Sequence, residues 1–145
     1  MNEERIRTLV RESAIRKKSI DTPRARALLE STREKMSVAT QLPLTDTTAT
    51  VIFEIVYNSL LSLGDALWWL EGYETRTHDA SLEILRDTTI NNQTELNHLP
   101  RLKDIRNNEQ YRGVKITTEQ TKDILEFWKT CGEEILKKAE ERAKT

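Results

Sequence analysis

A long apolar segment between about Thr45 and Glu71 constrains the fold of this chain more than any other feature. It contains no turn signal for more than twenty residues. The β-branched residues between Val51 and Val56 would suit a strand, but strands seldom reach such a length, so the segment predicts a helix. A helix that is apolar on nearly all sides is buried, and we therefore expect this one to lie at the centre of the protein. Its apolar residues are Val51, Ile52, Phe53, Ile55, Val56, Tyr57, Leu60, Leu61, Leu63, Ala66, Leu67, Trp68, Trp69 and Leu70.

Four polar residues interrupt this segment at helical intervals: Glu54, Asn58, Ser62 and Asp65. Spacings of 4, 4 and 3 residues gather them within an arc of about 80° on a regular helix. Two interpretations remain open for this polar stripe. It is either the solvent-facing edge of the helix, or the lining of a cleft that meets a cation or a nucleotide.

The remaining pattern predicts further helices. The chain has only 4 glycines and 3 prolines, which argues against a turn-rich β-sandwich or barrel. Thr117 and Gln120 match a capping box, the pattern of a helix start. The predicted fold class is all-α: an up-and-down bundle of five to six helices in a single domain covering residues 1–145. Besides the central helix, the expected helices span about Glu3–Lys18, Pro23–Val38, His78–Asp87, Leu99–Gly113 and Thr117–Lys144.

Several details of these elements are specific enough to check. The first helix is expected to bury Ile6, Leu9, Val10 and Ala14, and the second Ala27, Leu28, Met36 and Val38. Tyr73–Thr77 is expected to be a simple connection, and the polar stretch Thr88–Asn97 a loop.

The sequence offers few groups for enzyme chemistry. His78 and His98 have no partner at zinc-ligand spacing, so we expect no metal site. The single cysteine, Cys131, stands among apolar residues and is expected to be a small core residue. The glycines are scattered, which excludes the phosphate loops of P-loop and Rossmann proteins, and we expect no cofactor. With no apolar N-terminal stretch and one cysteine, the expected location is cytoplasmic, without a membrane span.

Charge is distributed unevenly along the chain. Residues 1–35 hold ten Lys and Arg against six Asp and Glu, residues 36–100 two against nine, and residues 101–145 eleven against nine. The basic ends and acidic middle indicate either a surface that faces a polyanion or helices that attract their neighbours within the bundle.

The order of features resembles that of HEPN domains over roughly residues 45–140. The resemblance rests on the segment Tyr57–Leu67, then Glu71-Gly72-Tyr73-Glu74, then Thr77-His78, then Arg106-Asn107 with Tyr111. The resemblance implies a small helical bundle, a homodimer, and binding of a nucleotide or RNA. HEPN proteins are also often paired with a small, separately encoded nucleotidyltransferase, as in toxin–antitoxin pairs.

Many HEPN proteins resemble ribonucleases through an arginine followed, several residues later, by a histidine. Here Arg106 and Asn107 are present, but Tyr111 stands where the histidine would be. A tyrosine with a pKa near 10 keeps its proton at neutral pH, whereas an arginine can still bind phosphate. The sequence thus favours a binding domain without catalytic residues. Since Arg106 and Tyr111 are about 140° apart on a regular helix, we expect them to converge only if the helix ends between them or a dimer partner intervenes.

Three hypotheses follow. In the first, a non-catalytic HEPN module binds a nucleotide or RNA phosphate, alone or as the partner subunit of a nucleotidyltransferase. Arg106 then meets phosphate, Asn107 and Tyr111 shape the rim, and the stripe residues Glu54, Asn58 and Asp65 share its cleft. The second is a metal-independent ribonuclease of toxin type, in which His78 or His98 reaches Arg106. The third is a ligand-free protein-interaction dimer whose interface is formed by Trp68, Trp69 and Trp128.

Overall fold

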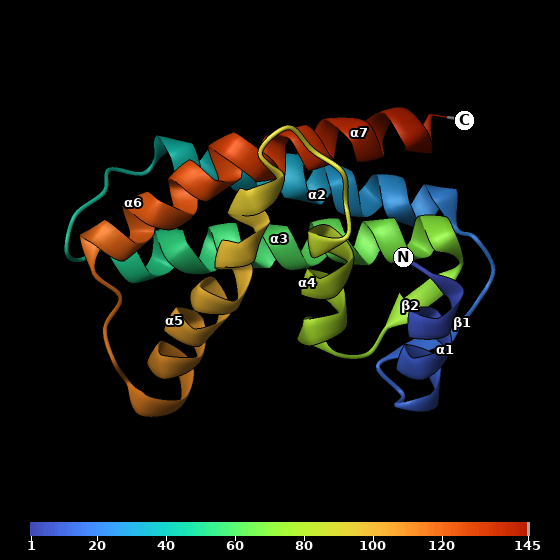
Figure 1. The fold of residues 1–145 in the computed structure, drawn as a ribbon. Coiled ribbons are helices and arrows are strands. Elements are labelled where there is room, and N and C mark those ends of the chain that lie inside the picture. Colours follow the sequence, from blue (N-terminus) through green and yellow to red (C-terminus); the bar gives the residue numbers. More distant parts are fainter. Residues whose placement is uncertain (145) are drawn as a thin grey trace.

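A central helix, α3, organises the fold. The computed structural model describes residues 1–144. In it α3 (Ala49–Glu71) lies lengthwise beside α2 (Thr22–Gln41), and both are covered by a third rod (Figure 1). That rod consists of α6 (Thr118–Phe127), a π-helical segment (Trp128–Gly132) and α7 (Glu133–Ala143). The predicted all-α bundle is confirmed, with this rod in place of the single last helix.

Two shorter helices, α4 (His78–Arg86) and α5 (Leu99–Arg112), run crosswise from the long rods on one side of the molecule (Figure 1). A 3₁₀ helix (Gln93–His98) leads into α5, and it replaces the end of the expected loop because Leu96 is buried there. The capping box at Thr117 and Gln120 is present as predicted.

The N-terminal region differs most from expectation. The first helix, α1 (Glu3–Arg11), is shorter than predicted because the chain turns at Ser13, whose φ is 62°. Ile15–Lys17 then forms a strand, β1, antiparallel to β2 (Tyr73–Thr75) in what was expected to be a connection. The prediction for Val10 was wrong, since it is exposed, while Ile15 is fully buried instead.

The buried face of α2 also differs from the face predicted from the sequence. Its buried residues are Ala25, Leu29, Thr32, Met36 and Ala39, at intervals of three and four residues. Ala27 and Val38, predicted to face inward, are exposed.

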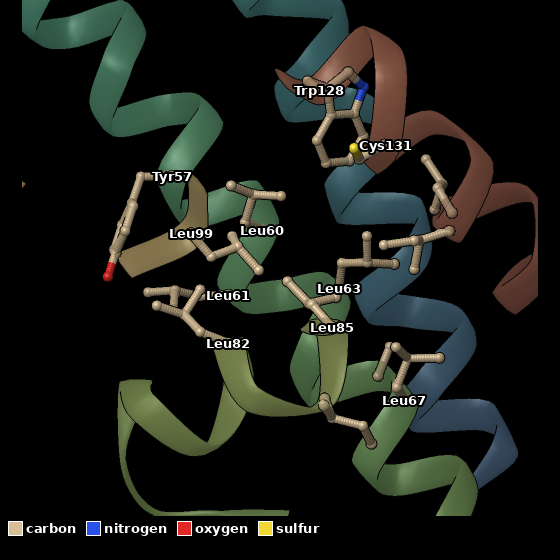
Figure 2. Close-up of a cluster of buried hydrophobic side chains, with 14 of the residues drawn as sticks. Tyr57, Leu60, Leu61, Leu63, Leu67, Leu82, Leu85, Leu99, Trp128 and Cys131 are labelled. Carbon is tan, nitrogen blue, oxygen red and sulfur yellow. The ribbon is translucent and has the colours of Figure 1, made fainter. Parts of the chain in front are cut away.

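The core explains the apolar character of α3. By length and hydropathy α3 is long and apolar enough to cross a membrane, but 67% of its most apolar window is buried inside the protein. Leucines of α3 and α4 meet around Leu63 and Leu85, and Trp128 and Cys131 close the same cluster (Figure 2). Cys131 is fully buried, as predicted, and burial raises the pKa of its thiol.

The three tryptophans belong to this core. Trp68 is fully buried, and Trp69 and Trp128 are 8% and 5% exposed. The indole Nε1 of Trp68 donates to the carbonyl of Ala80 at 2.9 Å. The tryptophan interface proposed for a ligand-free dimer is therefore wrong, because these rings are already covered within one chain.

Helix α4 lies close against α3 at Gly64. A Cβ atom at this position would lie 2.1 Å from the backbone oxygen of Ser81. Only a residue without a side chain lets the two backbones meet at this distance.

Replacing Gly64 with alanine is expected to lower the free energy of unfolding by about 3 kcal/mol, because α4 must move off α3. Urea unfolding followed by circular dichroism measures this. Gly113→Ala is the control: its site has open space but a φ of 68°, so only the backbone strain of about 1 kcal/mol applies. Equal losses in the two variants would contradict the close-approach explanation.

Candidate functional site

A hollow of about 320 Å³ lies where α3, the start of α4 and α5 meet. Basic and polar side chains from three parts of the chain converge on it. Its lining residues are Tyr57 from α3, Arg76, Thr77, His78 and Asp79 around the start of α4, and Lys103, Arg106, Asn107 and Tyr111 from α5. We call it the Arg106 hollow.

Arg106 is the central residue of this hollow. Its side chain is only 15% exposed, and its Nε lies 3.8 Å from Oε1 of Glu54. That distance exceeds a hydrogen bond, and the buried Nε has no hydrogen-bond partner. Within residues 1–144 the terminal guanidinium nitrogens also make no hydrogen bond. A largely buried guanidinium with unused donors suits an anion that accepts several hydrogen bonds at once.

The aromatic ring of Tyr57 packs against the guanidinium of Arg106. The Arg106 guanidinium carbon is 5.5 Å from the centre of the Tyr57 ring, within the range of a cation–π contact. The ring is buried against the leucine core while its hydroxyl points away from that core (Figure 2). Sequence reasoning placed Tyr57 among the apolar residues of the central helix and missed this second role. Its position one helical turn after Glu54, next to the polar stripe, was the sequence signal that could have indicated this role.

The Tyr57 hydroxyl is a donor rather than a base. Burial raises the pKa of Tyr57 to about 12, against the lowering effect of the nearby Arg106 charge. The phenol therefore keeps its proton at neutral pH and can donate a hydrogen bond to an anion.

The hollow carries more positive than negative charge. Lys103 forms an ion pair with Asp79 across α5 and α4, and Arg106 has Glu54 behind it. Glu54 is held in turn by the Gln110 amide, whose Nε2 donates to it at 3.4 Å. Arg76 makes no ion pair in the described part of the chain, so its charge is uncompensated there. An anionic ligand is the electrostatic complement of this arrangement.

Helix α5 brings Arg106, Asn107 and Tyr111 together without a break, since it runs to Arg112. The helix does not end between Arg106 and Tyr111, and the two side chains make no hydrogen bond or ring contact with each other within residues 1–144, so their convergence across a dimer stays a prediction. Both residues line the hollow, and Tyr111 is 78% exposed. An exposed aromatic ring beside cationic groups offers a surface on which a base can stack.

The four residues of the polar stripe on α3 do not share one environment. Glu54 contacts Arg106, as expected. Asn58, Ser62 and Asp65 instead line a neighbouring hollow of about 370 Å³ together with Lys35, Ile55, Leu61 and His78. The expectation that the whole stripe shares one cleft with Arg106 was wrong, because α4 begins between the two hollows and His78 lines both.

Asp65 anchors the segment that carries Arg76 and His78. Its Oδ1 accepts hydrogen bonds from the Thr75 hydroxyl at 2.6 Å and the Ser81 hydroxyl at 2.5 Å. These two residues flank the turn into α4. Asp65 therefore positions one wall of the Arg106 hollow, rather than lining that cleft as expected.

The two histidines have separate environments. His78 opens α4 and lines both hollows, while Thr77 supplies the capping hydrogen bond to the Ala80 N–H. His98 is half-exposed and lies 3.3 Å from Glu95, outside both hollows. Among residues 1–144 there is no group of three or more His, Cys, Asp or Glu side chains arranged to hold a metal ion.

Comparison of the chain with protein-family models, with curated proteins and with solved structures finds no match.

Replacing Asp65 with alanine is expected to loosen the turn into α4, since the Thr75 and Ser81 hydroxyls lose their shared acceptor. The expected loss is about 2 kcal/mol in the free energy of unfolding, with faster amide hydrogen exchange over residues 76–81. Asp65→Asn keeps one oxygen acceptor and serves as the control, with a smaller loss. Unchanged exchange over residues 76–81 in Asp65→Ala would contradict the anchoring role.

Proposed function

We propose that this protein is a non-catalytic, HEPN-type module that binds the phosphate of a nucleotide or of RNA in the Arg106 hollow. The observation that carries the proposal is the Nε of Arg106, which is buried without a hydrogen-bond partner on a side chain that is 15% exposed. Arginine recognises phosphate through two parallel hydrogen bonds.

In this proposal, each neighbour of Arg106 has a role in binding the nucleotide. Arg76 and Lys103 add positive charge, and the Tyr57 hydroxyl donates a hydrogen bond to phosphate. Glu54 holds the arginine from behind, so that its free edge faces the hollow. Tyr111 stacks on the base, and the amide of Asn107 is available to the base or sugar.

The proposal extends to quaternary structure through the HEPN resemblance. We propose a homodimer, and a small nucleotidyltransferase as a partner when one is encoded in a neighbouring reading frame. Size-exclusion chromatography with light scattering tests the first, and co-purification of the two expressed chains tests the second.

The binding site is tested by titrating adenosine 5′-monophosphate and a short single-stranded RNA into the protein by calorimetry. Arg106→Gln is expected to weaken binding of both at least about tenfold, which corresponds to the loss of one charged hydrogen bond. Arg101→Gln is the matched control on the same helix, because Arg101 pairs with Asp123 outside the hollow. Equal loss of affinity in the two variants, with the fold retained, would contradict the proposal.

A metal-independent ribonuclease is the second candidate. It is favoured by one observation: His78 lines the same hollow as Arg106, so an imidazole stands near the arginine although not at the motif position. An imidazole can accept a proton and is suited to activate a ribose hydroxyl as a general base.

Incubation of the purified protein with tRNA and total RNA, without added metal, separates the two candidates. The binding proposal predicts intact RNA. Cleavage that is lost in Arg106→Gln and in His78→Ala, but kept in His98→Ala, would replace it with the ribonuclease. His98 is the appropriate control because it lies outside the hollow.

A further inference from the structure

The hollow beside Lys35 is a second place where the fold offers unused hydrogen-bond donors. It lies between α2 and α3 at the start of α4, and we call it the Lys35 hollow. The Nζ of Lys35 donates one hydrogen bond, to the Ser62 hydroxyl at 2.9 Å. A lysine ammonium has three donors, so two remain. No acidic residue within residues 1–144 forms an ion pair with Lys35.

Other groups in this hollow are compatible with an anion. Asn58 is exposed at its edge, and Ser62 holds the lysine in place. Asp65 is the one acidic residue of the lining, and its Oδ1 is engaged on the α4 side by two hydroxyl donors. Lys35 enters from the α2 side, so the cation and the carboxylate come from different walls.

The two hollows are neighbours that meet at His78. At about 320 and 370 Å³, each holds the volume of roughly ten water molecules. That is more room than one phosphate fills. A ligand that occupies both hollows therefore extends past His78, from Arg106 on one side to Lys35 on the other.

We propose that the Lys35 hollow is a second phosphate subsite, so that the ligand is a nucleotide strand whose successive phosphates occupy the two hollows. The inference rests on the proposed function of the Arg106 hollow and adds a second, separately testable contact. A nucleoside diphosphate shares the chemistry of two phosphoryl groups, but it links them directly, whereas a strand places a sugar between successive phosphates.

Three probes distinguish these ligands: adenosine 5′-monophosphate, adenosine 5′-diphosphate and the 5′-phosphorylated dinucleotide pApA. Lys35→Met is expected to weaken pApA binding about tenfold, and to leave both mononucleotides unchanged. The dependence of log K on log salt for pApA should fall by about 0.7, the value for one phosphate contact on a single strand. Lys129→Met is the matched control, since Lys129 is an exposed lysine outside both hollows.

Each outcome decides something. If Lys35→Met leaves pApA binding unchanged while Arg106→Gln weakens it, the second subsite is wrong and the proposed function stands. If Lys35→Met weakens all three probes equally, the two hollows act as one site and the inference is also wrong. A tenfold effect on the diphosphate but not on pApA assigns the subsite to a pyrophosphate instead of a strand. If none of the probes binds the unaltered protein, the proposed function fails together with the inference.

Discussion

The arrangement of both hollows depends on the close contact between α3 and α4 at Gly64. Because the backbone of α4 reaches α3 there, the Trp68 indole can donate to the Ala80 carbonyl, and Asp65 can accept from the Ser81 hydroxyl. These contacts place the start of α4, with His78, between the two hollows. A core constraint, the absence of one side chain, thus sets the position of polar groups at the surface.

The helical part of the fold was predictable because its physical signals are local. The apolar run of α3 and the capping box before α6 each lie in one short stretch of sequence. The β1–β2 pair was not predictable in the same way. Ile15 and Thr75 are partners across sixty residues of chain, and neither three-residue strand has a pattern long enough to be recognised.

The candidate site was predictable in part. The resemblance led to Arg106, Asn107 and Tyr111, and helical spacing led to Glu54, and these four do belong to one region. The same spacing failed for Asp65 because periodicity gives the face of a helix but not the neighbours along its length. Tyr57 was missed because a buried aromatic ring on an apolar helix has the same pattern whether its hydroxyl is used or not. Arg76 and Lys35 come from other elements, and only the folded structure brings Arg76 to Arg106 and Lys35 to the stripe.

Helix α5 is attached to the rest of the protein mainly through its first half, where Leu99 and Leu102 are its buried residues. Its second half holds Asn107 and Tyr111 and adds little to the core. Substitutions there change the rim of the Arg106 hollow at small cost in folding free energy, since exposed positions tolerate exchange. The residues at the rim of this hollow can therefore diverge in evolution while the leucine and tryptophan core stays the same.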